Sequence, residues 1–294
     1  MTAASLAPGL PSPMIPSPVE RPRKPRRIAR MAWSGVVTVI VVACFAHTDM
    51  RWSRLVDFPS RAWHYLTLMF GPPDLSTLGH ALSATLLSVD MAWFGTVLGI
   101  VVSLPLSFLA TRGVGPLPVL VLVRGLFALL RAVPEVVIAI LILSVTGLTS
   151  YTGALAIAMG SIGTLGKWGY ESMEAVERGP IEAVRSAGGN LRQMVRWGIW
   201  PAAQPEVLAF WLYRFEISVR ASVILGLIGA GGIGKVLTDN VQFRIWNAVG
   251  TLLIVVVVVT VIIDLISGLL RRRLITGRWS APRLRRPRLR RRAA

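Results

Sequence analysis

The most constraining feature of this sequence is a series of long apolar segments separated by polar or basic stretches. A bilayer core about 30 Å thick requires about 20 mostly apolar residues for each helix that crosses it. Residues 31–47, 81–110, 117–146, 152–177, 199–228 and 246–270 are candidates for such spans. We expect kinks at Pro105 in the second and at Pro134 in the third. The sequence therefore predicts an all-α integral membrane protein with about six transmembrane helices.

The composition supports this class and argues against others. Hydrophobic residues make up 53% of the chain and charged residues only 16%, whereas about 25% of a soluble domain is charged. The single cysteine, Cys44, excludes a disulfide framework within one chain, and the three histidines lack metal-ligand spacing. We expect no metal site and no catalytic residues, because no nucleophile lies in a pattern with a base.

The apolar pattern and the charges divide the chain into four parts. Residues 1–30 hold seven prolines and a basic run, and we expect a disordered Pro/Arg-rich cytoplasmic tail. Residues 31–80 are expected to form a first transmembrane helix, retained as an anchor rather than cleaved, and an aromatic-rich extracytoplasmic segment on the interface. Residues 81–272 form the main transmembrane domain, and residues 273–294 an Arg-rich cytoplasmic tail.

The distribution of basic residues predicts the orientation. The formal net charge is +18, and 22 of the 32 Lys and Arg residues lie on the cytoplasmic side if the N-terminus is inside, against five in outer loops. The positive-inside rule then places both termini in the cytoplasm of a cell-membrane protein. Anionic lipid is the expected partner of the basic tail, which has no aromatic or fold signal for binding nucleic acid.

The cytoplasmic stretch at residues 178–201 has the pattern of two short helices. Pro180 and Glu182 suit the first turn of a helix, and Ile181, Val184 and Ala187 recur at helical spacing. On periodicity alone, an amphipathic hairpin lying on lipid headgroups is equally compatible with this pattern.

The second half of this stretch contains the signals that separate the two helices. Gly188 and Gly189 are expected to end the first helix, and Asn190 to cap the second. Pro201 is expected to close the unit before the next span.

Residues of this loop also carry a resemblance to a known family. Glu182-Ala183-Val184, Gly188 and the run Trp197 to Pro201 resemble the "EAA" loop of ABC importer permeases, which docks into the ATP-hydrolysing subunit. Residues 85–87, 95–99, 105–110, 131–135, 161–167, 212–216, 220–226 and 229–234 are similar to phosphonate importer permeases. Gly189 stands where that family often has Ala, and Trp200 where it usually has Leu. The resemblance covers about residues 80 to 270.

This resemblance implies a type I ABC importer permease fold with a cytoplasmic coupling-helix hairpin. The implied substrate is a phosphonate or a related phosphorus oxyanion such as phosphate or phosphite. The chain itself would bind no cofactor, since ATP and Mg²⁺ bind the partner subunit. The implied partners are two ATP-binding subunits, an extracytoplasmic substrate-binding protein and a second permease copy, giving a homodimer or a heterodimer with a paralogue. The implied coupling residues are Glu182, Ala183, Val184, Gly188, Gly189 and Pro201.

Charged residues within or near the spans are expensive in a bilayer and must face protein or water. Arg131 and Glu135 are four apart, as are Glu216 and Arg220, so each pair can share a helix face. Alternatively, Arg131, Arg214 and Arg220 give a net positive field that helps an anion across. The candidate pathway and gate residues are Arg131, Glu135, Arg214, Glu216, Arg220, Gly229, Gly231, Gly232 and Gly234.

Four further charged residues accompany the spans. Lys167 lies among glycines that predict close helix packing, and Arg124 and Asp264 lie near expected cytoplasmic ends, where they can extend toward the interface. Asp90 lies within the second span. The glycines around Lys167 are Gly160, Gly163, Gly166 and Gly169.

The glycine run at residues 229–234 matches the G-x-G-x-x-G pattern of dinucleotide-binding loops, and Lys235 makes it similar to a phosphate-binding loop. A dinucleotide loop needs a preceding strand, whereas this run follows an apolar span. A phosphate loop needs Ser or Thr after its Lys, and here Val236 follows. We therefore expect no nucleotide site, and the family resemblance implies a location near the extracytoplasmic gate.

A secondary transporter driven by an ion gradient is the alternative from a different functional class. It would account equally well for charges inside the membrane. It would not account for the spacing in residues 178–201, and the sequence shows no internal repeat of the kind that such transporters commonly have.

Overall fold

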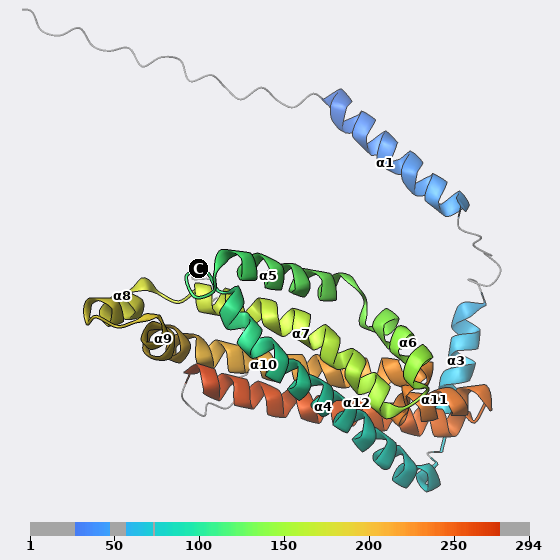
Figure 1. The fold of residues 1–294 in the computed structure, drawn as a ribbon. Coiled ribbons are helices and arrows are strands. Elements are labelled where there is room, and N and C mark those ends of the chain that lie inside the picture. The colour runs from blue at the N-terminus through green and yellow to red at the C-terminus, as the bar shows by residue number, and fades with distance from the viewer. Residues whose placement is uncertain (1–26, 48–56, 73, 277–294) are drawn as a thin grey trace, which may run out of the picture. The chain divides into compact units, whose positions relative to one another are not determined.

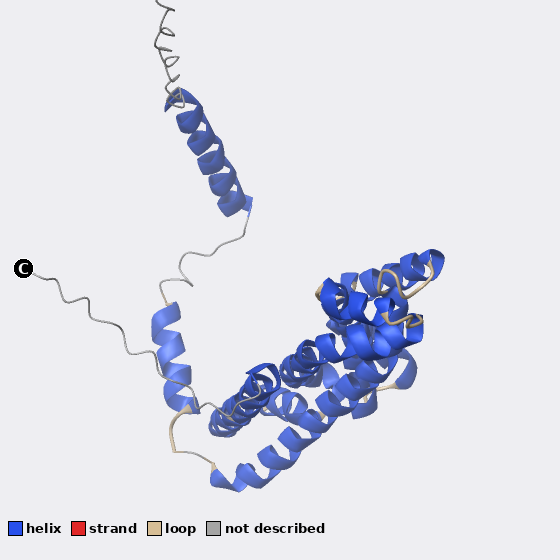
Figure 2. Ribbon diagram, turned by 90° about the vertical axis from the view of Figure 1, so that its left-hand side faces the viewer, coloured by secondary structure: helices blue, strands red, loops and turns tan. Residues whose placement is uncertain are grey.

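The protein is described by a computed structural model at residues 27–47, 57–72 and 74–276, and within these residues every regular element is helical (Figure 2). The chain divides into two compact units between Arg61 and Ala62, which are described separately. Residues 1–26 and 277–294, which make up most of the two predicted tails (1–30 and 273–294), lie outside the described residues, as does the interfacial residue Trp52. Residues 273–276, assigned from sequence to the C-terminal tail, are instead the last residues of the helix α12 (Trp246–Thr276).

The first unit contains one long helix, α1, at Arg27–His47. Its start lies four residues before the predicted span, so residues 27–30, assigned from sequence to the tail, are helical. Within α1, the apolar part Met31–His47 is shorter than a full membrane span by the usual criterion of length.

The second unit is a bundle built around long helices, with α8 and α9 at one end and α11 toward the other (Figure 1). A π-helical turn precedes α10 and another follows it. The helices, beginning with α3 at the boundary between the units, are α3 Phe58–Met69, η1 Leu75–Thr77, α4 Leu78–Ala110, α5 Leu117–Ala132, α6 Glu135–Thr146, α7 Ser150–Glu174, α8 Arg178–Ser186, α9 Leu191–Gln193, η2 Met194–Ile199, α10 Trp200–Leu225, η3 Gly226–Ala230, α11 Gly232–Gln242 and α12 Trp246–Thr276.

By length and composition, α4 and α12 are each able to cross a membrane as single helices. Two further candidates are bent pairs: α5 with α6, which meet at 87°, and the run Leu191–Ala230 with α11, which meet at 53°. The helix α7 covers the predicted span 152–177 except for its last three residues, but it is not among the helices apolar enough to qualify. Its neighbours α4, α5, α6 and α10 surround it, so its surface contacts protein and does not need to be strongly apolar.

The third predicted span, residues 117–146, is broken rather than kinked. The helix α5 ends at Ala132, and Pro134 is the N-cap of α6. Proline lacks the N–H needed to continue the preceding helix and disfavours helical geometry in the residue before it. Pro105, in contrast, lies inside α4, which continues without interruption to Ala110.

The aromatic segment between the first two spans is partly helical and contacts α12. In α3, Tyr65 packs edge-to-face on Trp246, with ring centroids 4.9 Å apart. The Met69 carbonyl lies so close to Gly250 that a Cβ there would overlap it. This segment therefore packs against the start of α12, while Phe58, Trp63 and Phe70 stay exposed, as expected for an interfacial position.

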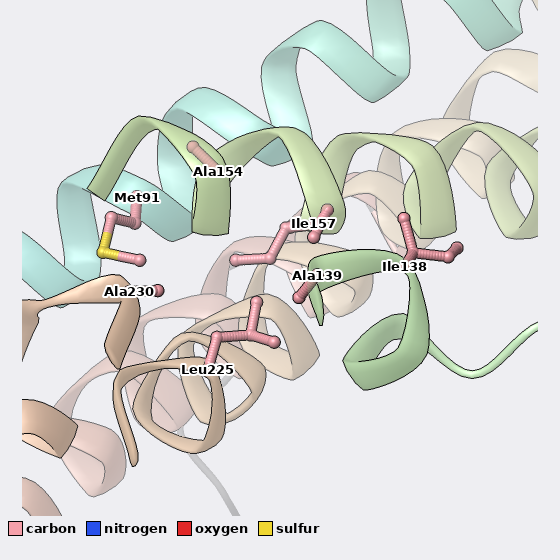
Figure 3. Close-up of a cluster of buried hydrophobic side chains, with 8 residues drawn as sticks. Met91, Ile138, Ala139, Ala154, Ile157, Leu225 and Ala230 are labelled. Atoms are coloured by element: carbon pink, nitrogen blue, oxygen red, sulfur yellow. The ribbon is translucent and has the colours of Figure 1, made fainter. Parts of the chain in front are cut away.

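The core between α4, α6, α7 and α10 is made of small and medium side chains. Met91, Ile138, Ile157 and Leu225 interdigitate there with buried alanines (Figure 3). Alanine and glycine let the backbones approach closely, which is typical of helix packing in membranes.

The glycines of α7 confirm the predicted close packing. A Cβ on Gly163 would lie 2.9 Å from Leu130 Cβ of α5, one on Gly169 would lie 2.6 Å from Ser107 Oγ of α4, and one on Gly166 would overlap the Phe127 ring. These contacts hold α7 between α4 and α5.

We expect Gly166→Ala to destabilise the protein by about 1–3 kcal/mol, because an added methyl must displace the Phe127 ring. In α12, a Cβ at Gly268 meets nothing within 4 Å, so Gly268→Ala should be neutral or slightly stabilising through its better helix propensity. Thermal unfolding in detergent would measure both. Equal effects of the two substitutions would contradict this account of α7 packing.

Candidate functional site

The first helix of the predicted coupling loop ends in a Schellman motif. Gly188 has φ +76°, a left-handed conformation that favours glycine. The Gly188 N–H donates to the Arg185 carbonyl (3.0 Å) and the Gly189 N–H to the Val184 carbonyl (2.9 Å). A Cβ on Gly189 would lie 2.5 Å from Val184 Cγ1. The prediction that these two glycines end the helix is confirmed, and a larger residue at position 189 would overlap Val184.

The second helix begins with a capping box, which confirms the predicted role of Asn190. The Gln193 N–H donates to Asn190 Oδ1 (3.0 Å), and the Asn190 N–H donates to Gln193 Oε1 (2.8 Å). From Gln193 the chain continues through the π-helical turn η2 directly into α10. The prediction that Pro201 closes the unit is wrong, because Pro201 lies in the first turn of α10, where a missing N–H is tolerated.

The predicted position of Glu182 in the first helix also needs correction. The helix α8 starts at Arg178, two residues before Pro180, and its first turn holds no acidic residue. Glu182 therefore lies in the second turn, where the helix dipole contributes little. Its side chain is exposed, as is that of Ala183, so both are accessible to a docking protein.

The apolar side of the loop packs on the helix bundle. Ile181 of α8 and Val195 of η2 contact a buried cluster of Met173, Ile199, Ala203 and Val207. This packing argues against the alternative of a hairpin lying on lipid headgroups.

A close crossing fixes α8 against η2. A Cβ on Gly198 would lie 3.3 Å from the Pro180 carbonyl oxygen and 3.4 Å from Ile181 Cα. The spacing of the loop did not identify Gly198 as a contact residue, because the crossing joins segments that only the folded chain brings together. The loop is thereby held as one unit on the ends of α7 and α10.

The outer side of the same unit forms a shallow hollow of about 400 Å³. The Trp197 side chain lines it and remains 65% exposed, and the Arg196 guanidinium lies 5.3 Å from the centre of its indole ring system. The other lining residues are Ala183, Val184, Ala187, Gly188, Gly189 and Gln193. Four of the six predicted coupling residues therefore share one surface.

A buried ion pair lies inside the bundle. Arg214 of α10, whose side chain is 5% exposed, pairs through Nη2 with Glu135 Oε1 of α6, and its Nε donates to Ser161 Oγ of α7 (2.9 Å). Gly160 makes room for the carboxylate, because a Cβ there would lie 2.5 Å from Glu135 Oε1. Charge and hydrogen bonding together join three helices at this point.

The expected pairing of Arg131 with Glu135 is wrong. Spacing by four residues brings two side chains together only within one helix, and the break at Pro134 places Arg131 in α5 and Glu135 in α6. Arg131 is exposed at the end of α5, and its Cγ lies near Gly163.

The pair Glu216–Arg220 is confirmed, with a third member. Arg220 Nη2 lies 2.7 Å from Glu216 Oε1 and 2.9 Å from Asp264 Oδ2 of α12. Asp264 was expected to extend toward the cytoplasmic interface and is instead held against α10. Arg214 and Arg220 thus have carboxylate partners, which counts against a positive field built from these two residues.

The remaining charges tie helix ends together or lie on the surface. Arg124 donates to the Ala110 carbonyl (2.9 and 2.7 Å), pairs with Glu174 and lies 4.2 Å from the centre of the Tyr170 ring. It therefore connects α4, α5 and α7 rather than extending into the lipid interface. Lys167 pairs with its own helix at Glu171 (3.5 Å), and Asp90 is exposed.

The glycine run at residues 229–234 forms the sharp connection between α10 and α11. Gly229, Gly231 and Gly232 have φ of +103°, +96° and +67°, which other residues rarely adopt. The Ile233 N–H donates to Ser88 Oγ of α4 (3.0 Å). Within the described residues a helix, not a strand, precedes this run, so the geometry of a dinucleotide-binding loop is lacking.

Comparisons with known proteins agree with this architecture. Residues 103–276 match the family described as "Binding-protein-dependent transport system inner membrane component". The "Phosphate-import permease protein PhnE" of Mycolicibacterium smegmatis is 35% identical over 85% of this chain and 47% of its own length. The "Putative phosphite transport system permease protein HtxC" of Stutzerimonas stutzeri is 33% identical over 84% of this chain and 87% of its own length. The chain thus spans about half of the first relative and most of the second.

Solved structures show the same fold. A chain of the MetNI methionine ABC transporter in an inward-facing conformation superposes with a TM-score of 0.61 at 17% identity, covering 68% of this chain and 99% of that chain. A chain of an amino acid ABC transporter crystallised with histidines superposes with a TM-score of 0.59 at 20% identity, covering 69% of this chain and 99% of that chain. The fold is therefore that of type I ABC importer permeases, and the protein belongs to the family of binding-protein-dependent transport system inner membrane components.

Proposed function

We propose that this protein is the transmembrane pore subunit of an ATP-driven importer for phosphonates or related phosphorus oxyanions. The observation that carries the proposal is the folded unit from α8 to η2, residues 178–199, which we call the coupling unit. It projects at one end of the bundle, is packed on the ends of α7 and α10, and presents an exposed hollow (Figure 1). Such a unit can transmit motion of a docked subunit to the spanning helices. An ion-driven transporter has no need of it.

The substrate class is supported by the relatives. The names of these relatives refer to phosphate for the permease of Mycolicibacterium smegmatis and to phosphite for two permeases of Stutzerimonas stutzeri. Phosphonate, phosphite and phosphate share a tetrahedral anionic group, so one pathway suits all three. The chain does no chemistry itself, and ATP and Mg²⁺ bind to the partner subunit.

The proposed complex contains two ATP-binding subunits, an extracytoplasmic substrate-binding protein and two permease copies. Val121, Leu122 and Leu129 of α5 form an exposed apolar face in the single chain, which either lipid or a second permease copy can cover. A homodimer needs only this chain, and a heterodimer with a paralogue is the alternative.

The proposed topology has both termini in the cytoplasm, with α8 and α9 on the same side. Glu182, Ala183, Val184, Gly188 and Gly189 then face the ATP-binding subunit. Pro201 contributes from the first turn of α10. The remaining proposed residues line or gate the pathway: Arg131, Glu135, Arg214, Glu216, Arg220, Gly229, Gly231, Gly232 and Gly234.

The test is to purify the tagged chain from its native host in mild detergent and quantify the co-purifying proteins by mass spectrometry. We expect an ATP-binding subunit at about one copy per permease chain. Uptake of labelled phosphite, with phosphonate and phosphate as competitors, would then test the substrate class. Recovery of a stable chain without any ATPase after crosslinking would overturn the importer assignment.

A further inference from the structure

A second hollow, of about 610 Å³, lies between α4, α10 and α12, and it shares no lining residue with the hollow of the coupling unit or with the Arg214–Glu135 pair. Its walls are almost entirely apolar, with Arg273 as the charged exception. The apolar lining includes Trp93, Val97, Ile100, Trp211, Phe215 and Leu270. We refer to this hollow as the α4–α12 groove.

The walls of the α4–α12 groove are held in place by contacts between helices. Trp93 of α4 packs edge-to-face on Phe215 of α10, with centroids 5.5 Å apart. Thr96 Oγ1 donates to Ser218 Oγ (2.9 Å) beneath them. Trp93 nevertheless remains 60% exposed. The groove is therefore a supported apolar surface that an elongated apolar molecule can enter.

One end of the α4–α12 groove is basic. Arg271, Arg272 and Arg273 are consecutive in the last turns of α12, and the Arg271 guanidinium lies 5.6 Å from the centre of the Tyr213 ring. The other end lies near Trp93, at the middle of the 33-residue helix α4. The groove thus runs from the middle of α4 to a cationic edge, which is the arrangement that a lipid in one leaflet of a bilayer core about 30 Å thick requires.

We propose that the α4–α12 groove binds an anionic phospholipid, with one acyl chain along Trp93, Val97 and Ile100 and the headgroup phosphate at Arg273. An apolar channel that ends at arginines is complementary to a chain attached to a phosphate. Under the proposed topology this lipid belongs to the cytoplasmic leaflet.

Charge also decides against protein occupants of the groove. A second copy of this chain would bring its own basic residues Arg271, Arg272 and Arg273 of α12 to the same end of the groove, and like charges repel there. The anionic lipid is the occupant whose charge opposes that of the groove.

The test is native mass spectrometry of the full-length chain after delipidation, titrated with phosphatidylglycerol or phosphatidylcholine carrying identical oleoyl chains. We expect the first phosphatidylglycerol to bind at least tenfold more tightly than phosphatidylcholine. Val97→Trp, which fills the groove from a partly exposed position, should abolish this tight binding. Equal affinities for the two lipids, or unchanged binding to Val97→Trp, would overturn the proposal.

Neighbouring arginines provide a matched control. Arg273→Gln should weaken phosphatidylglycerol binding about fivefold, as expected for one basic residue at a lipid surface. Arg272→Gln removes the same charge one residue away, at a position outside the groove lining. This substitution should change the affinity for phosphatidylglycerol less than twofold. Equal effects would mean a diffuse basic surface and would refute a built site.

A spectroscopic measurement keeps the proposal falsifiable if Val97→Trp does not fold. Phosphatidylglycerol with brominated chains should quench part of the tryptophan fluorescence, and Trp93→Phe together with Trp211→Phe should remove most of that part. A quenched fraction unchanged by both substitutions would refute the site. None of these results depends on transport, so the lipid site and the importer function can fail separately.

Discussion

Replacing Glu135 by Leu is expected to destabilise the protein by about 3–5 kcal/mol, since it leaves the Arg214 guanidinium buried without its carboxylate. Arg214→Leu should cost less, because the Glu135 side chain is 24% exposed and can be partly solvated. The double variant Glu135→Leu/Arg214→Met should recover much of the loss, since it removes both charges. Chemical unfolding in detergent, followed by tryptophan fluorescence, would measure these differences.

Arg131→Leu is the matched control for this experiment. The spacing of the sequence pairs Arg131 with Glu135, whereas the structure leaves it exposed at the end of α5. We expect its stability to stay within about 0.5 kcal/mol of the parent, as is usual for surface substitutions. If Arg131→Leu cost as much as Arg214→Leu, the pairing across the break at Pro134 would be incorrect.

Glu182→Lys is expected to reduce substrate uptake by more than tenfold while leaving membrane insertion and folding unchanged. Its side chain is exposed in the second turn of α8, so charge reversal should act on the docked subunit rather than on the fold. Gly188→Trp should act through the same surface and also strain the turn, because φ is +76° there. Uptake into cells, membrane protein level and ATPase activity of the purified complex are the measurements.

The control for charge reversal is Asp57→Lys, at an exposed position preceding α3. Asp57→Lys changes the net charge by the same amount as Glu182→Lys, at a position distant in sequence from the coupling unit. We therefore expect uptake to remain near the parental rate. Full uptake by the Glu182→Lys variant would contradict the proposed coupling role of this loop. A loss of uptake with both substitutions would indicate a general effect of charge.

Local features of the coupling unit were predictable because their causes lie within a few residues. The Schellman motif at Gly188 joins residues no more than five apart, and the capping box joins Asn190 to Gln193. Turn and cap signals act at this range, so the sequence contains the whole pattern. The error at Glu182 concerns where α8 begins, and the error at Pro201 arises because the π-helical turn η2 continues directly into α10.

The length of the apolar segments likewise predicted α4 and α12, which are long and apolar enough to cross a membrane, and the spacing of four glycines predicted the packing of α7. Both follow from the bilayer's demand for apolar length and from the small size of glycine. The 87° break between α5 and α6 was placed correctly at Pro134. Its size was not predictable, because a proline ends a helix without fixing the direction of the next one.

The sequence by itself determined the all-α membrane class, the spans at α4 and α12, the two-helix unit at residues 178–201 and the family. Only the tertiary structure decided which charges meet. Glu135 pairs with Arg214, 79 residues away, rather than with Arg131, and Arg220 reaches Asp264, 44 residues away. The physical reason is that a buried charge takes the nearest opposite charge in space, and that neighbour is set by how α6, α7, α10 and α12 pack.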